Sequence, residues 1–423
     1  MVDRAHNPAG IEAINVFGGT ASVDVRRLAE HRGLDLRRFA NLLIKEKAVA
    51  LPHEDPVTFG ANAAWPILES MTEIERSRIE LLISCTESGI DFSKSLSTYL
   101  HQHLGLSRNC RLFEIKQACY SGTAGLQMAI NFVLSGTSPG AKALVIATDI
   151  TRTSVPAGTD IGGTTWAYAE PTGGSGAVAL LVGAGCEVFQ MDTGASGYYG
   201  YEVMDACRPA ADEDAGDADL SLMSYMDCCE QSFSEYERRV RGADFRSSFH
   251  YLAFHTPFGG MVKGAHRALM RKTGAAGAHE IEADFEHRVR PSLEYCQQVG
   301  NIMSGTVFLA LAGAIDHGSF PEARRVGCFS YGSGCCSEFY SGVVRPGSQR
   351  VQRQFDIAAH LHRRYRLSIN EYEDILRHNA ELEFHASKLE LDKQRPFHQD
   401  SVRGTKQLEL VGIRNYHREY RWV

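Results

Sequence analysis

Four apolar runs in the first half of the chain indicate buried β-strands, because each is too short for a helix and lies near loop-forming residues. Helical patterns separate them at Ser93–Leu104 and Gly122–Leu134, and in the second pattern Leu126, Ile130 and Leu134 recur at helical spacing. Strands that alternate with helices predict an α/β fold with buried sheets. The predicted strands are Leu81–Thr86, Leu112–Lys116, Ala143–Thr148 and Ala177–Val182.

The second half of the chain repeats this alternation. Tyr251–His255 predicts a strand, and a helical pattern follows over about Val262–Lys272. Asn301–Ile315 is rich in small and apolar residues and predicts a helix, and Val326–Tyr331 predicts another strand. Between the halves, the acidic run Asp212–Asp219 predicts a solvated surface loop. The α/β prediction therefore extends over most of the chain.

The composition is that of an ordinary globular protein. The 423 residues are 43% apolar and 22% charged, which excludes a disordered chain, a collagen-like repeat and a coiled coil. Lys and Arg number 44 against 51 Asp and Glu, so the formal charge is 44 − 51 = −7. A protein whose main partner is nucleic acid usually shows a basic excess or a basic stripe, and this chain has neither. The length suggests two or three domains or one large duplicated fold.

Neither a membrane helix nor a secretion signal is predicted. The longest apolar stretches, such as Ala177–Ala184 and Thr306–Ile315, are far shorter than the ~20 residues that a membrane helix needs. Residues 1–8 lack the charged and apolar regions of a signal peptide, so we expect a cytoplasmic protein. The eleven cysteines include no C-x-x-C pair, which argues against a structural zinc site, and we expect no bound metal.

Cys119 is the first candidate for chemistry. It follows a predicted strand and precedes the helix pattern that starts at Gly122. A thiol at a helix start lies at the positive end of the helix dipole, which lowers its pKa and makes it a nucleophile. The first-turn amides can also donate to an oxyanion, and Gly122 leaves room for a substrate. The alternative is that Cys119 is one more buried core thiol.

His255 and Glu87 each lie where a predicted strand ends. Pro257 stops one of these strands and leaves His255 at the mouth of the sheet. Glu87 lies among small residues, where a pocket could raise the pKa of its carboxyl for general acid–base work. The alternatives are a satisfied core or capping histidine and a capping or surface acid. Asp91, which follows Glu87, can cap the next predicted helix.

Two polar residues in glycine-containing turns complete the set of candidates. Asn301, at a predicted helix start, is either a cap or a polar group for a carbonyl oxygen. Ser333 lies between two glycines and can offer a backbone amide to a ligand, or belong only to a tight turn. The chain has no G-x-G-x-x-G and no Walker A pattern, so nucleotide-dependent functions lack support.

Five segments follow one another along the chain: TESGID (86–91), QACYSGTAG (117–125), FHTPF (254–258), VGNIMSG (299–305) and FSYGSG (329–334). Together they resemble the 3-hydroxy-3-methylglutaryl (HMG) synthase family of the thiolase superfamily. The resemblance spans nearly the whole chain from Val16, and five motifs in one order are highly specific. It is closest to the branch that installs β-alkyl branches on carrier-protein-bound polyketides, because of Leu42–Pro52 and Asp55–Gly60.

The resemblance implies a task for each candidate residue. Cys119 becomes the acylated nucleophile, and Glu87 becomes the general acid and base. His255 orients and polarises the acceptor, and Asn301 is the amide on the acceptor side. The main chain of Ser333 completes an oxyanion hole with that of Cys119.

The resemblance also implies the overall architecture. We expect a thiolase-like α/β fold, in which two pseudo-duplicated βαβα halves form a layered α/β/α/β/α core. The N-terminal half, residues 1–185, would carry the Glu and the Cys of the site. The C-terminal half, residues 186–423, would carry the His, Asn and Ser together with a family-specific insertion. Members of this superfamily are typically homodimers.

One segment departs from the pattern of the mevalonate-pathway enzymes. In the pattern of those enzymes, a lysine follows the His-x-Pro segment shortly afterwards and helps to hold coenzyme A. Here Gly259 and Gly260 occupy much of that stretch, and the next lysine is Lys263. We therefore expect no bound cofactor and substrates carried on the phosphopantetheine of an acyl carrier protein (ACP) rather than on free coenzyme A. Lys263 can still meet a phosphate; the alternative is a solvated helix lysine.

The implied chemistry is covalent acyl transfer followed by condensation. The Cys119 thiolate attacks an acetyl thioester, and Glu87 removes a proton from the acetyl methyl. The carbon then adds to the β-ketone of a second carrier-bound chain, and hydrolysis frees the thiol. Donor and acceptor carrier proteins are generally acidic, so docking requires a local basic patch. The candidate patches are Arg26 with Arg27, Arg37 with Arg38, Lys45 with Lys47, and Arg238 with Arg239 and Arg241.

Three other functions stay open at this point. A coenzyme A-dependent HMG synthase would accept acetyl-CoA directly. A non-catalytic thiolase-fold subunit would only bind carrier protein, although the intact Glu87, Cys119 and His255 argue against it. A thiol hydrolase would release acetate without condensation and would need no acceptor pocket.

Overall fold

The computed structural model describes residues 8–151, 169–210, 213–272, 274, 277–380, 382, 386–391 and 405–423. Residues 1–7, on which the absence of a signal peptide was predicted, lie outside this part of the chain. Within the described ranges, no helix combines the length and the apolar character that crossing a bilayer requires.

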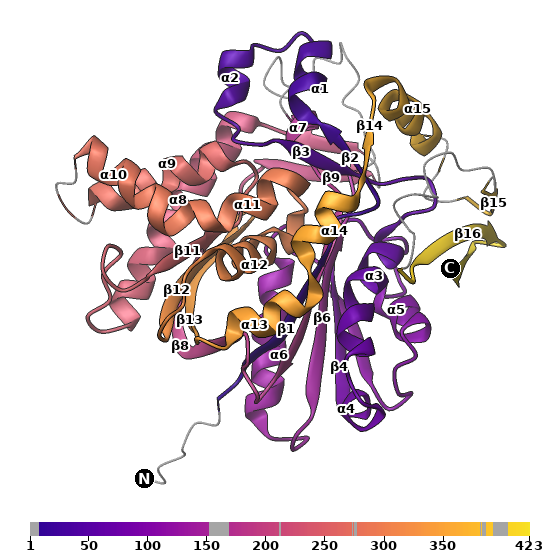
Figure 1. The fold of residues 1–423 in the computed structure, drawn as a ribbon, viewed down its shortest axis with the longest axis horizontal. Helices are drawn as coiled ribbons and strands as arrows, with labels where there is room; N and C mark the ends of the chain where they lie inside the picture. Colours follow the sequence, from indigo (N-terminus) through magenta and orange to yellow (C-terminus); the bar gives the residue numbers. More distant parts are fainter. Residues whose placement is uncertain are drawn as a thin grey trace.

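Nine strands of the described residues form one mixed sheet (Figure 1). β4, β5 and β6 run parallel to one another, and so do β11 and β12, whereas the remaining neighbours are antiparallel. The sheet has two parts, one of β11, β12, β13 and β8 and the other of β1, β7, β6, β4 and β5. The two parts meet where the first residues of β1 pair with β8. In order across the sheet, the strands are β11 (Tyr251–Phe254), β12 (Arg324–Gly332), β13 (Cys336–Val344), β8 (Phe189–Gly200), β1 (Gly10–Phe17), β7 (Gly176–Gly183), β6 (Lys142–Asp149), β4 (Ile79–Cys85) and β5 (Arg111–Ile115).

Helices cover the sheet in three layers. α6 (Ser121–Ser135) and α12 (Thr306–His317) contribute to a central core together with strands from both parts of the sheet. α3 (Pro56–Glu69) packs on the outer face of the β4, β6 and β7 region, while α8 (Ala218–Arg239) and α9 (Gly259–Lys272) pack on the outer face of β11, β12 and β13. The predicted α/β class and its α/β/α/β/α layering are therefore confirmed.

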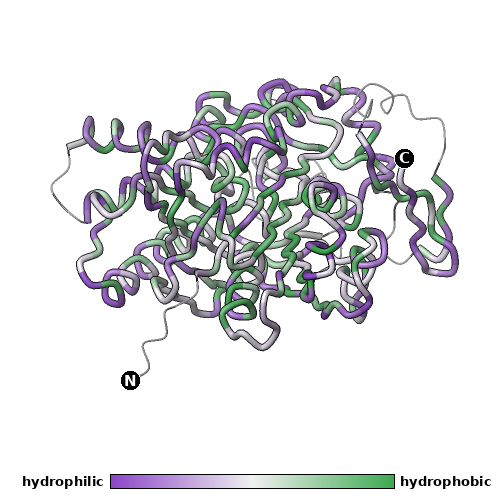
Figure 2. Tube along the Cα trace, turned by 60° about the horizontal axis from the view of Figure 1, so that its bottom comes forward, coloured by the Kyte–Doolittle hydropathy of each residue, from purple (hydrophilic) through white to green (hydrophobic). Residues whose placement is uncertain are grey.

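The strands are apolar on both faces because both faces are buried. Ile83 and Val145 contribute to the central core, whereas their neighbours Leu82 and Leu144 contribute to the outer one. Successive side chains of a strand point to opposite faces, so a strand between two helical layers has no polar side. Figure 2 shows the consequence, with hydrophobic positions gathered along the central segments and hydrophilic ones along the outer segments.

The other described elements connect or extend these layers. β7 ends and β8 begins on either side of the predicted boundary at residue 185, and the division into halves stays a prediction. The remaining elements are β2 (Ala21–Asp24), α1 (Val25–His31), α2 (Leu36–Ala40), β3 (Glu46–Val49), α4 (Glu73–Ser77), α5 (Ser97–His103), α7 (Ala169–Thr172), β9 (Ala206–Ala210), β10 (Glu213–Gly216), α10 (Ala278–Asp284), the π-helical turn η2 (Phe285–Val289), α11 (Arg290–Val299), the 3-10 turns η3 (Met303–Gly305) and η4 (Arg353–Phe355), α13 (Ser348–Gln352), α14 (Ile357–Arg363), β14 (Tyr365–Leu367), α15 (Ile369–Ala380), β15 (Lys388–Glu390), β16 (Leu408–Arg414) and β17 (His417–Trp422).

The predicted strands and the helix α6 are confirmed to within two residues at each end. The helix predicted from Ser93 starts only at Ser97, because the Asp91 carboxylate accepts hydrogen bonds from the Ser93 and Lys94 amides and holds a separate turn. The surface loop predicted for the acidic run is wrong in part. Its described residues form β10, and Asp217 accepts hydrogen bonds from the first amides of α8 as an N-cap.

The C-terminal hairpin of β16 and β17 is tied to α3 by one buried carboxylate. Asp55 is fully buried, and its Oδ1 accepts hydrogen bonds from two amides of the first turn of α3. Its Oδ2 accepts from Tyr420 Oη at 2.7 Å and pairs with Arg418 Nη1 at 3.3 Å. Beside them the rings of Trp65 and Trp422 pack with centroids 4.9 Å apart. Asp55 thus both caps the helix and holds the hairpin, which Asn62 of α3 also holds through two hydrogen bonds with the Leu408 backbone.

The substitution Asp55→Ala tests this connection. It removes the helix cap and leaves the buried Arg418 without this carboxylate, so we expect a loss of about 3–5 kcal/mol in the free energy of unfolding. Urea unfolding followed by circular dichroism measures the change. The matched control is Glu75→Ala, which removes an exposed capping acid of α4 and should shift the midpoint far less. Equal midpoints for Asp55→Ala and wild type would show that the hairpin is held by other contacts.

Candidate active site

Asp149 holds the loop that carries Glu87. It ends β6, next to the end of β4 in the parallel pair, and its side chain is fully buried. Its Oδ1 accepts hydrogen bonds from Thr86 Oγ1 at 3.0 Å, from the Glu87 amide at 2.8 Å and from the Ser88 amide at 3.0 Å. The backbone of the loop that carries Glu87 is therefore fixed by one carboxylate.

The second oxygen of Asp149 holds a segment from the other half of the chain. Oδ2 accepts hydrogen bonds from the amide of Ser304 at 3.0 Å and from its hydroxyl. The same hydroxyl contacts the Cys85 carbonyl oxygen at 3.0 Å. Burial raises the pKa of the Asp149 carboxyl, and the hydrogen bonds from Ser304 and the Glu87 amide oppose this increase. The carboxylate thereby joins the Glu87 loop to the turn that follows Asn301.

Cys119 lies between β5 and α6, in a strained and nearly enclosed position. Only 9% of the residue is exposed, and Ala118 before it has a φ of 44°, a left-handed conformation that costs a non-glycine residue ~1–3 kcal/mol. Burial raises the pKa of the Cys119 thiol well above its usual value, and the nearby charge of Glu87 raises it further. The predicted lowering of this pKa by the helix start is therefore wrong for the free protein. Desolvation and a neighbouring carboxylate outweigh the helix dipole.

Two glycines bring the chain close around Cys119. A Cβ atom at Gly332 would lie 2.7 Å from both the Gln117 carbonyl oxygen and the Tyr120 amide nitrogen. The end of β12 therefore packs directly on the segment that carries Cys119. At Gly122 a Cβ would overlap the carbonyl oxygen of Ser304. The prediction that Gly122 leaves room for a substrate is wrong, because that room is filled by the turn that Asp149 holds.

Ser333 follows Gly332 in the turn between β12 and β13, so it lies next to the Cys119 segment. Asp205 fixes this turn, because its Oδ1 accepts from the Gly334 amide at 2.8 Å and its Oδ2 from Tyr331 Oη at 2.5 Å. Asp205 is fully buried. The amides of Cys119 and Ser333 thus belong to two segments in direct contact, as an oxyanion hole requires.

His255 lies just after β11 and is held through its backbone. Its amide donates to the Phe329 carbonyl of β12 at 2.7 Å, and its own carbonyl accepts from Tyr225 Oη of α8 at 2.7 Å. Burial lowers the pKa of the imidazole to about 3, so the ring is neutral. Within the described ranges no hydrogen-bond partner faces its buried Nδ1. A buried polar atom without a partner costs ~1–3 kcal/mol, which favours a ligand as the missing partner.

Asn301 contributes an amide at the edge of the same region. Its Oδ1 accepts from the Met303 amide at 3.0 Å and from Thr306 Oγ1 at 2.9 Å. These bonds form a turn with Met303 at a φ of 47°, so α12 starts at Thr306 and the helix predicted from Asn301 begins five residues too early. Because Oδ1 is used by the turn, the side-chain NH2 is the group that can donate to a carbonyl oxygen.

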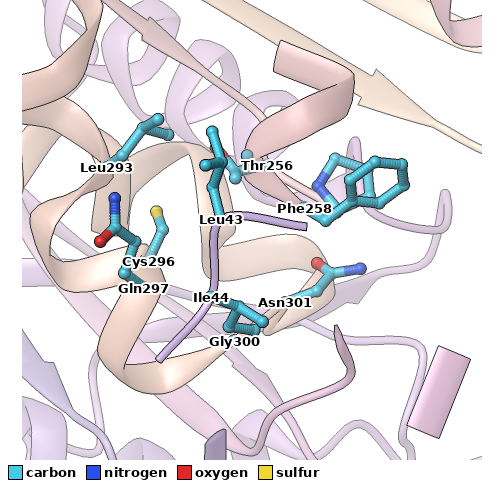
Figure 3. A pocket seen from close by; sticks show the side chains of 11 residues that line it. Leu43, Ile44, Thr256, Phe258, Leu293, Cys296, Gln297, Gly300 and Asn301 are labelled. Atoms are coloured by element: carbon cyan, nitrogen blue, oxygen red, sulfur yellow. The ribbon is translucent and has the colours of Figure 1, made fainter. Parts of the chain in front are cut away.

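Asn301 also lines a small cavity with Leu43, Thr256 and Phe258 (Figure 3). Its volume is about 10 Å³, which is close to the space of one water molecule and too small for an acyl chain. The loop around Leu43 closes it, and a Cβ at Gly259 would lie 2.7 Å from Leu43 Cβ. The first turn of α9 therefore packs tightly on this loop.

Lys263 lies about one turn after Gly259, in the second turn of α9. Its ammonium pairs with Glu282 Oε1 at 2.6 Å and lies 5.3 Å from the centroid of the Phe285 ring. These contacts belong to α10 and η2 and give no contact with the Cys119 segment among the described residues. The assignment of Lys263 to a phosphate stays a prediction.

Sequence reasoning missed several buried or charged residues that position the site. Asp149 and Asp205 hold its turns, and Arg208 donates from Nη1 to the Glu87 carbonyl oxygen at 3.0 Å. Glu338 is 4% exposed and accepts from Tyr120 Oη at 2.7 Å, next to Cys119. Only Asp149 has a sequence signal, since it directly follows a predicted strand, as Glu87 does. The other three act from strands and loops that no local pattern connects to Cys119.

Comparisons with known proteins extend over nearly the whole chain. The family model for the N-terminal part of hydroxymethylglutaryl-coenzyme A synthase matches residues 6–187, and the model for the C-terminal part matches residues 266–421. A polyketide biosynthesis 3-hydroxy-3-methylglutaryl-ACP synthase, PksG of Bacillus subtilis (strain 168), is 61% identical over 416 residues, which cover 98% of this chain and 99% of PksG. A hydroxymethylglutaryl-CoA synthase of Enterococcus faecalis is 34% identical over 367 residues, which cover 86% of this chain and 90% of that protein.

Two solved structures are similar in fold to this chain. The HMG synthase of the curacin biosynthetic pathway, in complex with acetyl donor-ACP, has a TM-score of 0.94 at 56% identity and covers 98% of this chain and 100% of its own. MvaS in complex with 3-hydroxy-3-methylglutaryl coenzyme A has a TM-score of 0.84 at 31% identity, with coverages of 98% and 99%.

The substitution Gly332→Ala tests the contact between the Ser333 turn and the Cys119 segment. The added Cβ meets backbone atoms, so the turn must move, and a displacement of about 1 Å can cost up to ~100-fold in rate. We expect acylation of Cys119 by an acyl thioester to slow by ~10- to 100-fold. Gly347→Ala is the matched control, because a Cβ there meets no atom within 4 Å and the rate should not change. Unchanged acylation in Gly332→Ala would exclude this contact from the site.

The low pKa of His255 predicts a pH-dependent stability. Below pH ~6.5 a histidine in the unfolded chain binds a proton, whereas the buried His255 of the folded protein stays neutral because its pKa is about 3. The free energy of unfolding therefore decreases as the pH falls below ~6.5. Between pH ~6.5 and ~5, wild type should lose about 2 kcal/mol more unfolding free energy than His255→Gln. Urea titrations at a series of pH values measure the difference, and the similarly buried His360 cancels between the two proteins. Parallel curves would contradict a neutral, buried imidazole.

Proposed function

Since the chain belongs to the hydroxymethylglutaryl-CoA synthase family, we propose that it is an HMG synthase that acts on carrier-bound acyl groups in polyketide synthesis. It transfers an acetyl group from acetyl-ACP to Cys119 and condenses it with the β-ketone of an ACP-tethered chain. The product is a 3-hydroxy-3-methylglutaryl-type β-branch. The family predicted from the five motifs is confirmed by the matches over residues 6–187 and 266–421.

The observation that carries the chemistry is the assembly of the Glu87 loop and the Ser333 turn around Cys119. In the free enzyme Cys119 is a neutral thiol, because burial and the Glu87 carboxylate raise its pKa. When an acetyl thioester binds, the Cys119 sulfur attacks its carbonyl carbon, the C–S bond to the carrier breaks, and the Cys119 proton leaves with the carrier thiol. Glu87, next to the acetyl-enzyme, removes a proton from the acetyl methyl as general base.

The enolate that forms requires donors that are already in position. The amides of Cys119 and of Ser333 belong to segments in direct contact through Gly332, and they supply such donors. Asp205 fixes the Ser333 turn and Asp149 fixes the Glu87 loop, so neither has to reorganise during the reaction. Preorganised amides of this kind lower the barrier by ~2.7–4 kcal/mol each.

His255 and Asn301 act on the acceptor. The His255 ring is neutral, and its buried Nδ1 has no hydrogen-bond partner among the described residues. A neutral imidazole can polarise the β-ketone of the acceptor without adding a charge to the site. The Oδ1 of Asn301 is used by the Met303 amide and the Thr306 hydroxyl, so the side-chain NH2 is the group that donates to the same acceptor. After condensation, hydrolysis of the Cys119 thioester releases the product.

A carrier protein is favoured over free coenzyme A by two observations. The relative at 61% identity is an HMG-ACP synthase, and the similar curacin enzyme was solved with acetyl donor-ACP. In addition, a side chain at Gly260 would overlap the Asn41 carbonyl oxygen, so position 260 has no space for a long residue that reaches a nucleotide. Phosphopantetheine on donor and acceptor ACPs then delivers the substrates, without a further bound cofactor or metal. A cytoplasmic homodimer completes the proposal.

The carrier docks on α1 and α2, where exposed cations lie close to the site. Arg26, Arg27, Arg37 and Arg38 are exposed there, at the top of Figure 1, and Lys45 follows on the loop that reaches the cavity of Asn301. The inclusion of Lys47 in this patch was wrong. It is buried, its ammonium donates to the Glu170 carbonyl oxygen at 2.5 Å, and burial lowers its pKa to about 8. At the other predicted patch, Glu235 pairs with both Arg238 and Arg239, whereas on α1 and α2 Glu30 pairs with Arg26.

Intact-protein mass spectrometry tests the acyl-enzyme and its carrier. After mixing with acetyl-ACP, wild type should gain one acetyl group and Cys119→Ala none. Acetylation from the carrier and not from acetyl-CoA supports the proposal, whereas efficient acetylation from acetyl-CoA indicates the coenzyme A-dependent enzyme. No adduct from either donor would leave the non-catalytic subunit as the better interpretation.

Glu87→Gln separates acylation from condensation. Removing the carboxylate removes one cause of the raised Cys119 pKa, so acetylation should persist. Condensation with an acetoacetyl-ACP acceptor should fall ~10²–10⁴-fold, the usual effect of losing an acid or base. Product formation is followed by mass spectrometry of the acceptor carrier. Release of acetate without product from wild type would indicate a thiol hydrolase, and normal condensation by Glu87→Gln would overturn the assignment of Glu87.

A further inference from the structure

A second pair of thiols lies close to the site and takes no part in the reaction described above. Cys228 on α8 and Cys335 in the turn between β12 and β13 have their sulfur atoms 2.8 Å apart. A disulfide bond measures about 2.03–2.05 Å, so a small approach would join them. Both residues are nearly inaccessible, at 0% and 5% exposure. The sequence gives no sign of this pair, because the two residues are separated by 107 positions.

Each thiol is connected to a part of the site. Cys335 lies two residues after Ser333, and its amide donates to the Tyr201 carbonyl oxygen at 2.9 Å while Gly334 is held by Asp205. Cys228 lies one helical turn after Tyr225, whose hydroxyl donates to the His255 carbonyl oxygen at 2.7 Å. A bond between the sulfurs would therefore link the support of His255 to the turn that carries Ser333.

The segment that lies against the pair is partly exposed. Tyr199 and Tyr201, whose rings contact each other, are 37% and 39% exposed. The Tyr201 and Cys335 backbones pair with each other, and Ser337 Oγ reaches the Tyr199 carbonyl oxygen at 2.7 Å. A local opening of this strand would admit a small reagent without disturbing the central core.

The two thiols are also unequal in acidity. Hydrogen bonds from Cys228 and Tyr331 lower the pKa of Cys335, whereas the contact with Cys335 and burial raise that of Cys228. Cys335 is therefore the better nucleophile toward a disulfide, and Cys228 is placed to complete the exchange. Cys119, with its raised pKa, is a poorer one.

We propose that Cys228 and Cys335 are a thiol modification site, which a low-molecular-weight disulfide converts reversibly to an internal disulfide that slows the reaction at Cys119. The effect on rate rests on the proposed function; the modification itself does not. Cys335 attacks one sulfur of the small disulfide, the S–S bond breaks, and one thiol leaves with a proton. Cys228 then attacks the mixed disulfide, and the second small thiol leaves with the Cys228 proton. The protein loses two hydrogen atoms, and the small disulfide gains two.

The bond acts by moving the Ser333 turn. Cys335 must approach α8, and Gly334 moves with it, so the Ser333 amide leaves its position beside the Cys119 segment. A shift of this size can reduce the rate by ~10- to 100-fold. Reduction by a dithiol returns the turn to the position that Asp205 holds.

Peptide mapping of the wild-type chain after treatment with 2-hydroxyethyl disulfide tests the modification. Free thiols are alkylated before digestion, and the expected product is a Cys228–Cys335 crosslinked peptide that disappears with dithiothreitol. Cys335→Ala must abolish the crosslink. Absence of the crosslink in wild type, or a mixed disulfide on Cys335 that never closes, would overturn the proposal, whether or not the chain is an acyltransferase.

The rate of Cys119 acetylation by acetyl-ACP, before and after the same treatment, tests the effect. Wild type should slow by ~10- to 100-fold and recover with dithiothreitol. Cys228→Ala should acetylate normally and be insensitive to the reagent, while Cys186→Ala, a buried thiol beside Gly183, should remain as sensitive as wild type. Equal loss in Cys228→Ala would assign the inhibition to another thiol and overturn the regulatory part. If reduced wild type takes no acetyl group at all, the proposed function fails, and the crosslink map alone decides the modification site.

Discussion

The buried carboxylate of Asp149 is the interaction on which the site depends. One of its oxygens binds the Glu87 loop and the other binds Ser304, so segments far apart in the sequence meet on a single side chain. Removing a carboxylate from water costs several kcal/mol, and hydrogen bonds to a charged group return about 1.5–3 kcal/mol each. The hydrogen bonds offset the cost of burying the Asp149 carboxylate only while both the Glu87 loop and the Ser304 turn are in place. The position of Glu87 and that of the turn after Asn301 are therefore coupled.

Close approach of backbones is the second constraint. Gly332 lets the end of β12 lie on the Cys119 segment, and Gly122 lets the first turn of α6 lie on the Ser304 carbonyl. Both contacts would be broken by a single Cβ atom. The candidate site thus lies where strands and helices of the two parts of the sheet come together, and the donors proposed for the enolate are main-chain amides. This arrangement makes the proposed oxyanion hole rigid, and on that proposal the rate is sensitive to small displacements of the Ser333 turn.

Burial also decides the charge of two candidate site residues. Cys119 and His255 are both neutral in the free protein, since desolvation raises the pKa of the first and lowers that of the second. Cys335 differs from Cys119, because it receives hydrogen bonds from Cys228 and Tyr331 that lower its pKa. Two cysteines in neighbouring segments thus have pKa shifts of opposite sign, since the pKa of Cys119 is raised and that of Cys335 is lowered.

The sequence by itself determined most of the helices and strands and the candidate site residues Glu87 and Cys119. Alternating apolar runs and helical spacing gave the strands β4 and β6 and the helix α6, and motif order pointed to Glu87 and Cys119. These features depend on near neighbours in the chain, so a local pattern can carry them.

Only the tertiary structure decided the acidity of Cys119, the burial of Lys47 and the ion pair of Lys263. Each depends on groups that the fold brings from elsewhere: Glu87 beside Cys119, the Glu170 carbonyl beside Lys47, and Glu282 beside Lys263. Desolvation and charge act through space, and the distances that set them do not exist until the chain is folded.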